Sequence, residues 1–234
     1  MKRLLSAVLT LALLLVFCTP QTRAGGQTKG CIALTFDDGP SGDLTERLLD
    51  GLRARGIHAT FFVCGYRVAQ YPRTLCRIAQ EGHEVGLHSC CHDYMQHMDY
   101  DTAQQDLTEC MQAVSECCGV RPRLFRPPGG LYSQTLLQAA RDLELSVILW
   151  SVDPRDWNPE AWDGVLTVIV SDTHDGSIIL MHDLSMHSVR CALEAVDRLQ
   201  AQGYAFCTVS ELAALRGQAL AAGEIYTCFP RSDS

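Results

Sequence analysis

The ten residues Cys31-Ile32-Ala33-Leu34-Thr35-Phe36-Asp37-Asp38-Gly39-Pro40 place an apolar run directly before two aspartates and a Gly-Pro turn. A short apolar run ended by turn residues is typical of a buried strand, so the aspartates stand where the strand meets the turn. Two neighbouring carboxylates in a half-buried place are unfavourable unless a cation or a proton neutralises one of them. The stretch therefore predicts either a metal site or an ordinary turn with capping aspartates, and alone it does not separate the two.

Apolar runs of the same kind recur along the chain and alternate with amphipathic helical patterns. Strands are expected at 31–36, 60–64, 84–88, 123–126, 146–152, 177–182 and 205–209. Helices are expected at 44–55, 73–81, 102–118, 134–142, 162–171, 188–202 and 210–216. Strands that alternate with helices predict an α/β fold with a parallel sheet.

Unusual polar residues gather at the carboxyl ends of the expected strands. They are Asp37, Asp38, His88, Arg126, Asp153 and His182. In α/β barrels the active site is built on that face from several different strands. Polar residues with purely structural roles would not be concentrated at the carboxyl ends of the strands, so the pattern predicts a single composite site.

The first 24 residues have the pattern of a secretory signal peptide: Lys2 and Arg3, an apolar run at 4–17, and small residues before Ala24. The apolar run is too short to span a bilayer, which needs about 20 residues. Cleavage there would change the formal net charge from −8 to −11, because it removes Lys2, Arg3 and Arg23 and no acid. An acidic exported chain is a poor partner for nucleic acid or an anionic membrane. We expect a monomer that is secreted or associated with the cell wall and has no membrane contact beyond the leader; an uncleaved N-terminal anchor is the alternative.

The remaining length suits one α/β domain, expected at 29–216, followed by a surface tail at 217–234. The chain has 12 cysteines, of which Cys18 lies in the leader, so an odd number remains. Export makes some disulfides plausible, but the spacing shows neither a stapled mini-scaffold nor a Cys-x-x-Cys zinc site. Most are interpreted as small core residues or surface thiols, and the pattern indicates no particular pairing.

His88-Ser89-Cys90-Cys91-His92 places two imidazoles four residues apart, so that both can point at a common centre. Such pairs also occur on solvated helix faces. With one aspartate they would form a two-histidine, one-carboxylate ligand set with open positions, as in catalytic zinc sites. The intervening cysteines are a weaker alternative set for a soft metal.

Three further segments carry candidate residues. The first is Arg126-Pro127-Pro128-Gly129-Gly130, in which the prolines fix the backbone and the glycines allow close approach of a substrate. Arg126 can hold a nearby carboxylate ionised. The alternative is a rigid loop whose arginine makes an ordinary salt bridge. Asp153-Pro154-Arg155-Asp156-Trp157 is either a polar turn before a core tryptophan or a pocket wall. Leu180-Met181-His182-Asp183 ends a strand in a histidine, which is a proton-transfer candidate only with a charged partner.

Together these motifs resemble the NodB-like polysaccharide deacetylases, carbohydrate esterase family 4. The segments 35–40, 88–92, 126–130, 153–157 and 180–183 match the five motifs of that family in order, and the resemblance runs from about residue 29 to 216. Any one motif is weak evidence, whereas five in order are highly specific. The resemblance implies a distorted, incompletely closed (β/α)7 barrel, in agreement with the expected strands.

The resemblance also implies a role for each residue. Asp38, His88 and His92 would bind a divalent metal, zinc first, with cobalt, manganese or nickel as alternatives. Asp37 would be the general base, and Arg126 would orient it. His182 would be the general acid, and an aspartate of the fourth motif would lie beside it, which we assign to Asp153 rather than Asp156. Trp157 and Leu180 would line the pocket for the acetyl methyl.

One position departs from the family pattern. Gly129 stands where an aromatic residue is usual, at the position whose backbone N–H donates to the oxyanion in the family. The donor survives this change, whereas a side-chain wall is lost, so the departure bears on substrate fit rather than on the chemistry.

The expected function is removal of N-acetyl groups from an amino-sugar polysaccharide, either peptidoglycan or a chitin-like oligosaccharide, by metal-activated water. Two alternatives remain: O-deacetylation of xylan, since the same chemistry cleaves esters, and a catalytically silent carbohydrate-binding domain. A glycosidase is disfavoured, because adjacent aspartates beside a histidine pair suit a metal better than the carboxyl spacing of about 5 to 9.5 Å that glycosidases need.

Overall fold

The computed structural model describes residues 28–231. The expected signal peptide, 1–24, lies outside the described residues. The strands are β1 (Gly30–Gly39), β2 (Thr60–Val63), β3 (Glu84–Leu87), β4 (Leu124–Phe125), β5 (Ser146–Ile148), β6 (Ile178–His182), β7 (Tyr204–Cys207) and β8 (Ile225–Tyr226). The α-helices are α1 (Asp43–Ala54), α2 (Gly65–Gln70), α3 (Pro72–Gln80), α4 (Tyr100–Cys118), α5 (Gln134–Asp142), α6 (Val165–Asp172), α7 (Met186–Ala201) and α8 (Val209–Leu215). Three 3-10 helices, η1 (Met95–His97), η2 (Pro128–Gly130) and η3 (Pro159–Gly164), lie in the connections.

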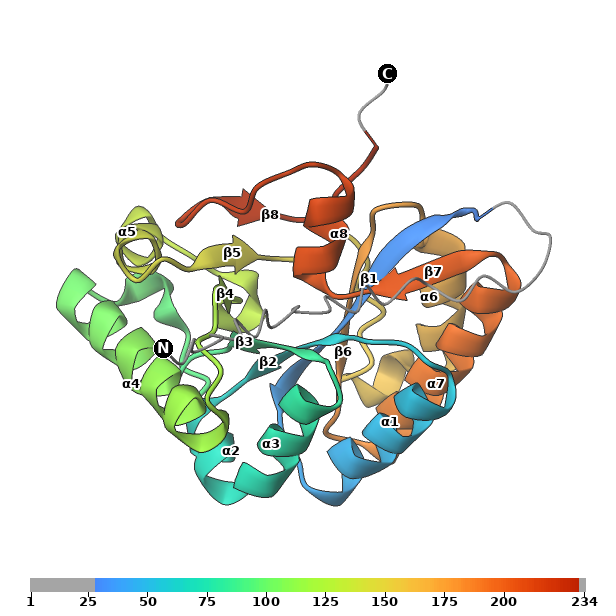
Figure 1. Cartoon of the computed structure of the whole chain (residues 1–234), viewed down its shortest axis with the longest axis horizontal. Coiled ribbons are helices and arrows are strands. Elements are labelled where there is room, and N and C mark those ends of the chain that lie inside the picture. The colour runs from blue at the N-terminus through green and yellow to red at the C-terminus, as the bar shows by residue number, and fades with distance from the viewer. Residues whose placement is uncertain (1–27, 232–234) are drawn as a thin grey trace, which may run out of the picture.

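The strands form one curled parallel sheet in the order β6-β1-β2-β3-β4-β5-β8, with β7 also paired to β1 (Figure 1). All seven strands expected from the sequence are present, and the parallel sheet is confirmed. The helix expected at 162–171 begins at Val165 after η3, and the short α2 was not expected.

The sheet curls into a barrel that is incompletely closed between β5 and β6. After β5 the chain makes a single parallel bridge, from Val152 to Ile179. In the tail a single antiparallel bridge joins Cys228 to Ser177 at the start of β6. The predicted distorted (β/α) barrel is therefore confirmed, and the gap is bridged by isolated contacts rather than by a regular ladder.

The C-terminal tail does not form the surface appendage that we expected. It contributes β8, which pairs in parallel with β5, and its Phe229 is fully buried against Ile178 and Leu212 in the smaller of two apolar clusters. The prediction was wrong because a two-residue strand has no detectable periodicity, and its pairing depends on a β5 edge that lies far away in the sequence.

Alternation along the strands decides which side chains face the inside of the barrel. On β1 the inward residues include Ala33, Thr35 and Asp37, which lie in register with Ile178, Leu180 and His182 of β6. The lower layers are apolar, with Ala33 and Ile178 in the smaller cluster. The uppermost layer, at the carboxyl ends of the strands, is polar. Among residues 28–231, no helix is both long and apolar enough to cross a bilayer.

Candidate active site

The two aspartates lie at the end of β1 and point in different directions. Asp37 is the last inward residue of the strand, in register with His182 of β6, and it is only 3% exposed. The pairing of β1 with β2 shifts register between Asp37 and Gly39, so Asp38 occupies an irregularity in the strand. Asp38 has φ 69°, a left-handed conformation that is uncommon for a residue with a side chain and is concentrated at functional sites.

Asp38 converges with the two histidines that the sequence singled out. One ligand atom from each of Asp38, His88 and His92 lies within 4.8 Å of the others. His88 follows β3 directly, and its Nε2 is 3.2 Å from Asp38 Oδ1; the Nε2 of His92 is 3.1 Å from the same oxygen. His92 also has a positive φ, 63°, which turns the loop back toward the strand ends.

The donor set fits a divalent metal ion. Asp38 Oδ1 is buried and makes no hydrogen bond within the described residues, although two imidazole nitrogens lie close to it. The His88 Nδ1–H donates to the backbone oxygen of Arg126 (2.8 Å), which leaves the Nε2 lone pair free to face the centre. Cys90 and Cys91 are not part of the converging group, so the alternative cysteine ligand set is wrong.

The ionisation of Asp38 agrees with this role. Burial raises the pKa of the carboxyl, but the neighbouring His88 and His92 outweigh burial and hold the pKa well below its usual range. Asp38 is therefore a carboxylate at neutral pH, as a metal ligand must be.

Arg126 follows β4 and is completely buried under the site. Its Nη1 donates to Asp37 Oδ1 and to Thr35 Oγ1, both at 2.7 Å. Its Nε and Nη2 donate to the backbone oxygens of Ile148 and Leu149 at the end of β5, both at 3.0 Å. These four bonds fix the guanidinium, so Arg126 lies where it can position the Asp37 carboxylate.

The carboxylate beside His182 belongs to Asp156 and not to Asp153, so our assignment within the fourth motif was wrong. Asp156 is buried; its Oδ1 accepts from the His182 Nδ1–H at 2.8 Å, and its Oδ2 accepts from the His182 backbone N–H at 2.9 Å. Asp153 is exposed, and its Oδ1 accepts from the backbone N–H of Arg155 at 2.9 Å. An aspartate before Pro154 makes such a turn readily, and this was the signal that its carboxylate was already engaged.

The Asp156 contact sets the charge of His182. Burial lowers the pKa of the imidazole, but the hydrogen bond and the negative charge of Asp156, with smaller contributions from Asp37 and Asp38, outweigh burial and raise the pKa to about 9. His182 is therefore a cation at neutral pH. With Nδ1 engaged by Asp156, its Nε2–H is the proton available to a substrate.

Tyr94 lies beside Gly129, the position at which the family pattern usually has an aromatic residue. A Cβ placed on Gly129 would lie 2.8 Å from the Tyr94 ring, and Gly129 has φ 64°, so an aromatic side chain there would be both strained and blocked. The Tyr94 ring stands 6.2 Å from the ring of His92 and is 61% exposed. Tyr94 was missed because an exposed tyrosine in an irregular segment carries no sequence signal.

The remaining residues predicted to bind substrate, Leu180 and Trp157, lie close in sequence to His182 and Asp156. Leu180 is buried in the inner layer directly below His182. Trp157 follows Asp156 and is 60% exposed, so it is a surface indole rather than a core tryptophan. The indole of Trp162, in η3, donates to the backbone oxygen of Asp156 at 2.9 Å and fixes this loop.

Residues 24–148, more than half of the chain, match the family model described as polysaccharide deacetylase. The chain belongs to the polysaccharide deacetylase family. Among curated relatives it is 36% identical over 204 residues to the peptidoglycan-N-acetylmuramic acid deacetylase PdaC of Bacillus subtilis, covering 87% of this chain and 43% of that protein. The chain thus spans less than half the length of this relative.

Solved structures of the family have the same fold. A structure described as T48 deacetylase with substrate superposes with a TM-score of 0.79 at 35% identity and covers 85% of this chain and 96% of that one. A family 4 acetyl xylan esterase from Clostridium thermocellum, in complex with a cobalt ion, superposes with a TM-score of 0.78 at 31% identity and covers 86% and 99%. The match supports the incompletely closed barrel and a metal-dependent family.

Proposed function

We propose that the protein is a secreted, metal-dependent hydrolase that removes N-acetyl groups from peptidoglycan or a related amino-sugar polymer. One observation carries the proposal: the adjacent aspartates are divided between two environments, Asp38 with His88 and His92, and Asp37 with Arg126. His182, cationic and held by Asp156, lies in register with Asp37 on the next strand. The family and the PdaC relative support the amide-cleaving activity.

The residues of the site supply what amide hydrolysis needs. Asp38, His88 and His92 would hold a divalent ion, which would supply Lewis acidity and make a water molecule more acidic. Asp37 accepts the proton of the attacking water, and Arg126 orients the carboxylate for that transfer. His182 gives its Nε2 proton to the departing nitrogen, while Asp156 stabilises the cation until the transfer occurs.

O-deacetylation is the second candidate, because a structural neighbour is an acetyl xylan esterase. The test measures released acetate and newly formed amine separately, with the zinc-loaded protein on peptidoglycan, N-acetylglucosamine oligomers and acetylated xylan. We expect equal amounts of acetate and amine from an amino-sugar substrate. Acetate released from acetylated xylan alone would show that the enzyme is an O-deacetylase. No acetate from any of the three substrates would favour the catalytically silent carbohydrate-binding domain.

Export is a separate part of the proposal and has its own measurement. N-terminal sequencing of protein collected from the culture medium should begin at Gly25, directly after the predicted cleavage site. A mature protein that still begins at the initiator methionine would contradict cleavage at this site.

The position of Tyr94 leads to a prediction about substrate binding. The exposed ring stands beside His92 and over Gly129, so it can stack on a sugar next to the reacting acetyl group. Tyr94→Ala should raise KM by about three- to tenfold, since an aromatic contact contributes about 0.5–1.5 kcal/mol, with little change in kcat. Tyr94→Phe keeps the ring and should bind almost normally. A wild-type KM for Tyr94→Ala would remove this residue from the substrate site.

A further inference from the structure

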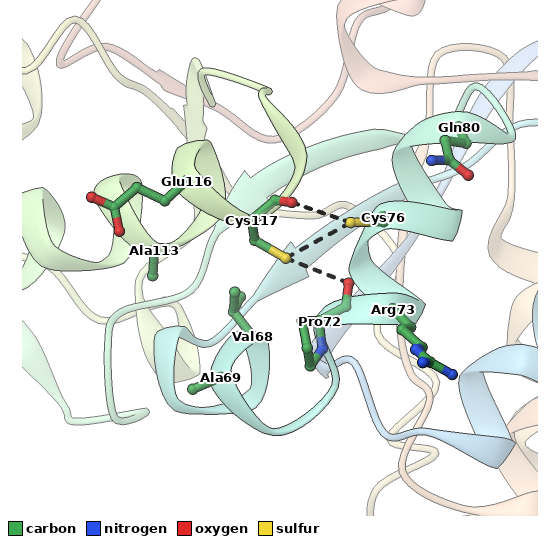
Figure 2. A pocket seen from close by; sticks show the side chains of 9 residues that line it. All are labelled: Val68, Ala69, Pro72, Arg73, Cys76, Gln80, Ala113, Glu116 and Cys117. Carbon is green, nitrogen blue, oxygen red and sulfur yellow. Dashed lines mark hydrogen bonds between the residues drawn. The ribbon is translucent and has the colours of Figure 1, made fainter.

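Two thiols outside the set of active-site residues, Cys76 of α3 and Cys117 near the end of α4, face each other. Their sulfur atoms are 3.9 Å apart, and the side chains point toward one another from facing helices (Figure 2). The Cys76 thiol donates to the Cys117 backbone oxygen at 3.2 Å, and the Cys117 thiol donates to the Pro72 backbone oxygen at 3.4 Å. Both are free thiols, and both are partly exposed.

The surroundings leave this pair accessible to a second molecule. The two cysteines line an open pocket of about 660 Å³, together with Val68, Pro72 and Ala113. Cys31 and Cys207 are a second pair of neighbouring thiols, but Cys207 is buried; Cys64 and Cys110 are buried too, and the Cys118 thiol donates to the Val114 backbone oxygen of its own helix. Cys76 and Cys117 thus combine contact between two thiols with an open approach.

The pair is suited to structural cross-linking rather than to catalysis. Burial and the adjacent Cys76 thiol raise the pKa of Cys117 to about 11, so Cys117 is a protonated thiol at neutral pH. The sulfur atoms must approach by roughly 2 Å to reach bonding distance, which is within the range of small rotations of two short side chains.

The position of a cross-link in the chain would matter for the active site. A bond from Cys76 to Cys117 would close a loop that contains β3 and both metal-binding histidines, His88 and His92. It would also fix α3 against α4, the two helices that flank this segment in the sequence. The loop that holds two of the three proposed metal ligands would then be tied at both ends.

We propose that Cys76 and Cys117 form a disulfide in the exported protein. One thiolate attacks the disulfide of an oxidant, either a dithiol–disulfide oxidoreductase or a small-molecule disulfide, and releases one thiol of that oxidant. The second thiolate then attacks the mixed disulfide, closes the Cys76–Cys117 bond and releases the other thiol. The protein gives up two electrons and two protons, and the oxidant is reduced to the dithiol state. The proposal requires an oxidising compartment but not the deacetylase activity.

The experiment oxidises the purified full-length protein with glutathione disulfide at pH 8.5, blocks free thiols with iodoacetamide and digests without reduction. Trypsin with a glutamate-specific protease separates 74–77, which holds Cys76, from 117–123, which holds Cys117 and Cys118. We expect these peptides to appear joined, with two hydrogens lost, and to separate after dithiothreitol treatment. Cys118→Ser is the matched control that should keep the link, whereas Cys117→Ser should lose it.

A thermal unfolding measurement gives an independent readout. The cross-link closes a loop of about 40 residues, so the oxidised wild-type protein should unfold roughly 5–15 °C above the reduced form, and Cys76→Ser should show no such difference. The proposal is overturned if the two peptides remain separate in the wild-type protein, or if the link persists in Cys117→Ser through Cys118. Because neither readout uses turnover, failure here leaves the proposed deacetylase function untouched.

Discussion

Asp38→Asn is expected to abolish tight zinc binding, whereas Asp37→Asn should retain the zinc and lose about 10²- to 10⁴-fold in kcat. Asp38 Oδ1 lies within 3.2 Å of both imidazole Nε2 atoms, and an amide oxygen there loses the negative charge that the ion requires. Asp37 is held by Arg126 on the other side, and its amide cannot accept the proton of the attacking water. Metal content after dialysis and turnover on the same substrate separate the two outcomes.

The control for this pair has to address stability, because Asp37 is the buried partner of a buried arginine. The amide oxygen of Asp37→Asn can still accept from Arg126, but Arg126 loses its counter-charge, and the free energy of unfolding should fall by about 3–5 kcal/mol at most. Both variants are therefore compared with Asp43→Asn, a surface change in the first turn of α1, by thermal unfolding and metal analysis. Equal metal loss in the Asp37 and Asp38 variants, with both still folded, would contradict the division of roles.

Much of the fold was predictable because the decisive patterns are local. The buried run at 31–36 shows that β1 is covered on both sides, as a central parallel strand must be, and β1 indeed pairs with β2, β6 and β7. The tail was not predictable, because β8 is a strand only through its pairing with β5. Closure between β5 and β6 likewise depends on single long-range bridges that have no local pattern.

The candidate site likewise has residues that local sequence patterns predict and residues whose positions depend on tertiary packing. His88, His92, Asp38 and Arg126 could be named because each follows a strand, and the carboxyl ends of parallel strands meet at one edge. The choice between Asp153 and Asp156 depended on how the loop after β5 turns, where Arg155 has φ 56° and reverses the chain. The role of Tyr94 depended on where an irregular segment passes Gly129. Such positions follow from tertiary packing, and sequence spacing alone does not determine them.

Asp156→Asn should shift the alkaline limb of the pH profile of kcat/KM to lower pH by roughly one pH unit or more. The general acid must carry its proton, so activity falls as the pH rises through the pKa of His182, which the site raises to about 9. Because the Asp156 contact is the main cause that raises this pKa, its neutral amide should let the pKa fall. At pH 9 the protonated fraction of His182, and with it the rate, should fall about fivefold or more, whereas at pH 7, below the pKa in both proteins, the rate should change little.

The matched control is Asp153→Asn, three residues away in the same loop. Asp153 is exposed and engages only the backbone N–H of Arg155, so this variant should keep the wild-type pH profile. A bound divalent ion lowers the pKa of His182 by its own charge, but it does so in both variants, so the difference between their alkaline limbs isolates Asp156. An unchanged limb in Asp156→Asn would show that another group limits activity at high pH. A shift of the alkaline limb in Asp153→Asn alone would instead indicate that Asp153 is the partner of His182.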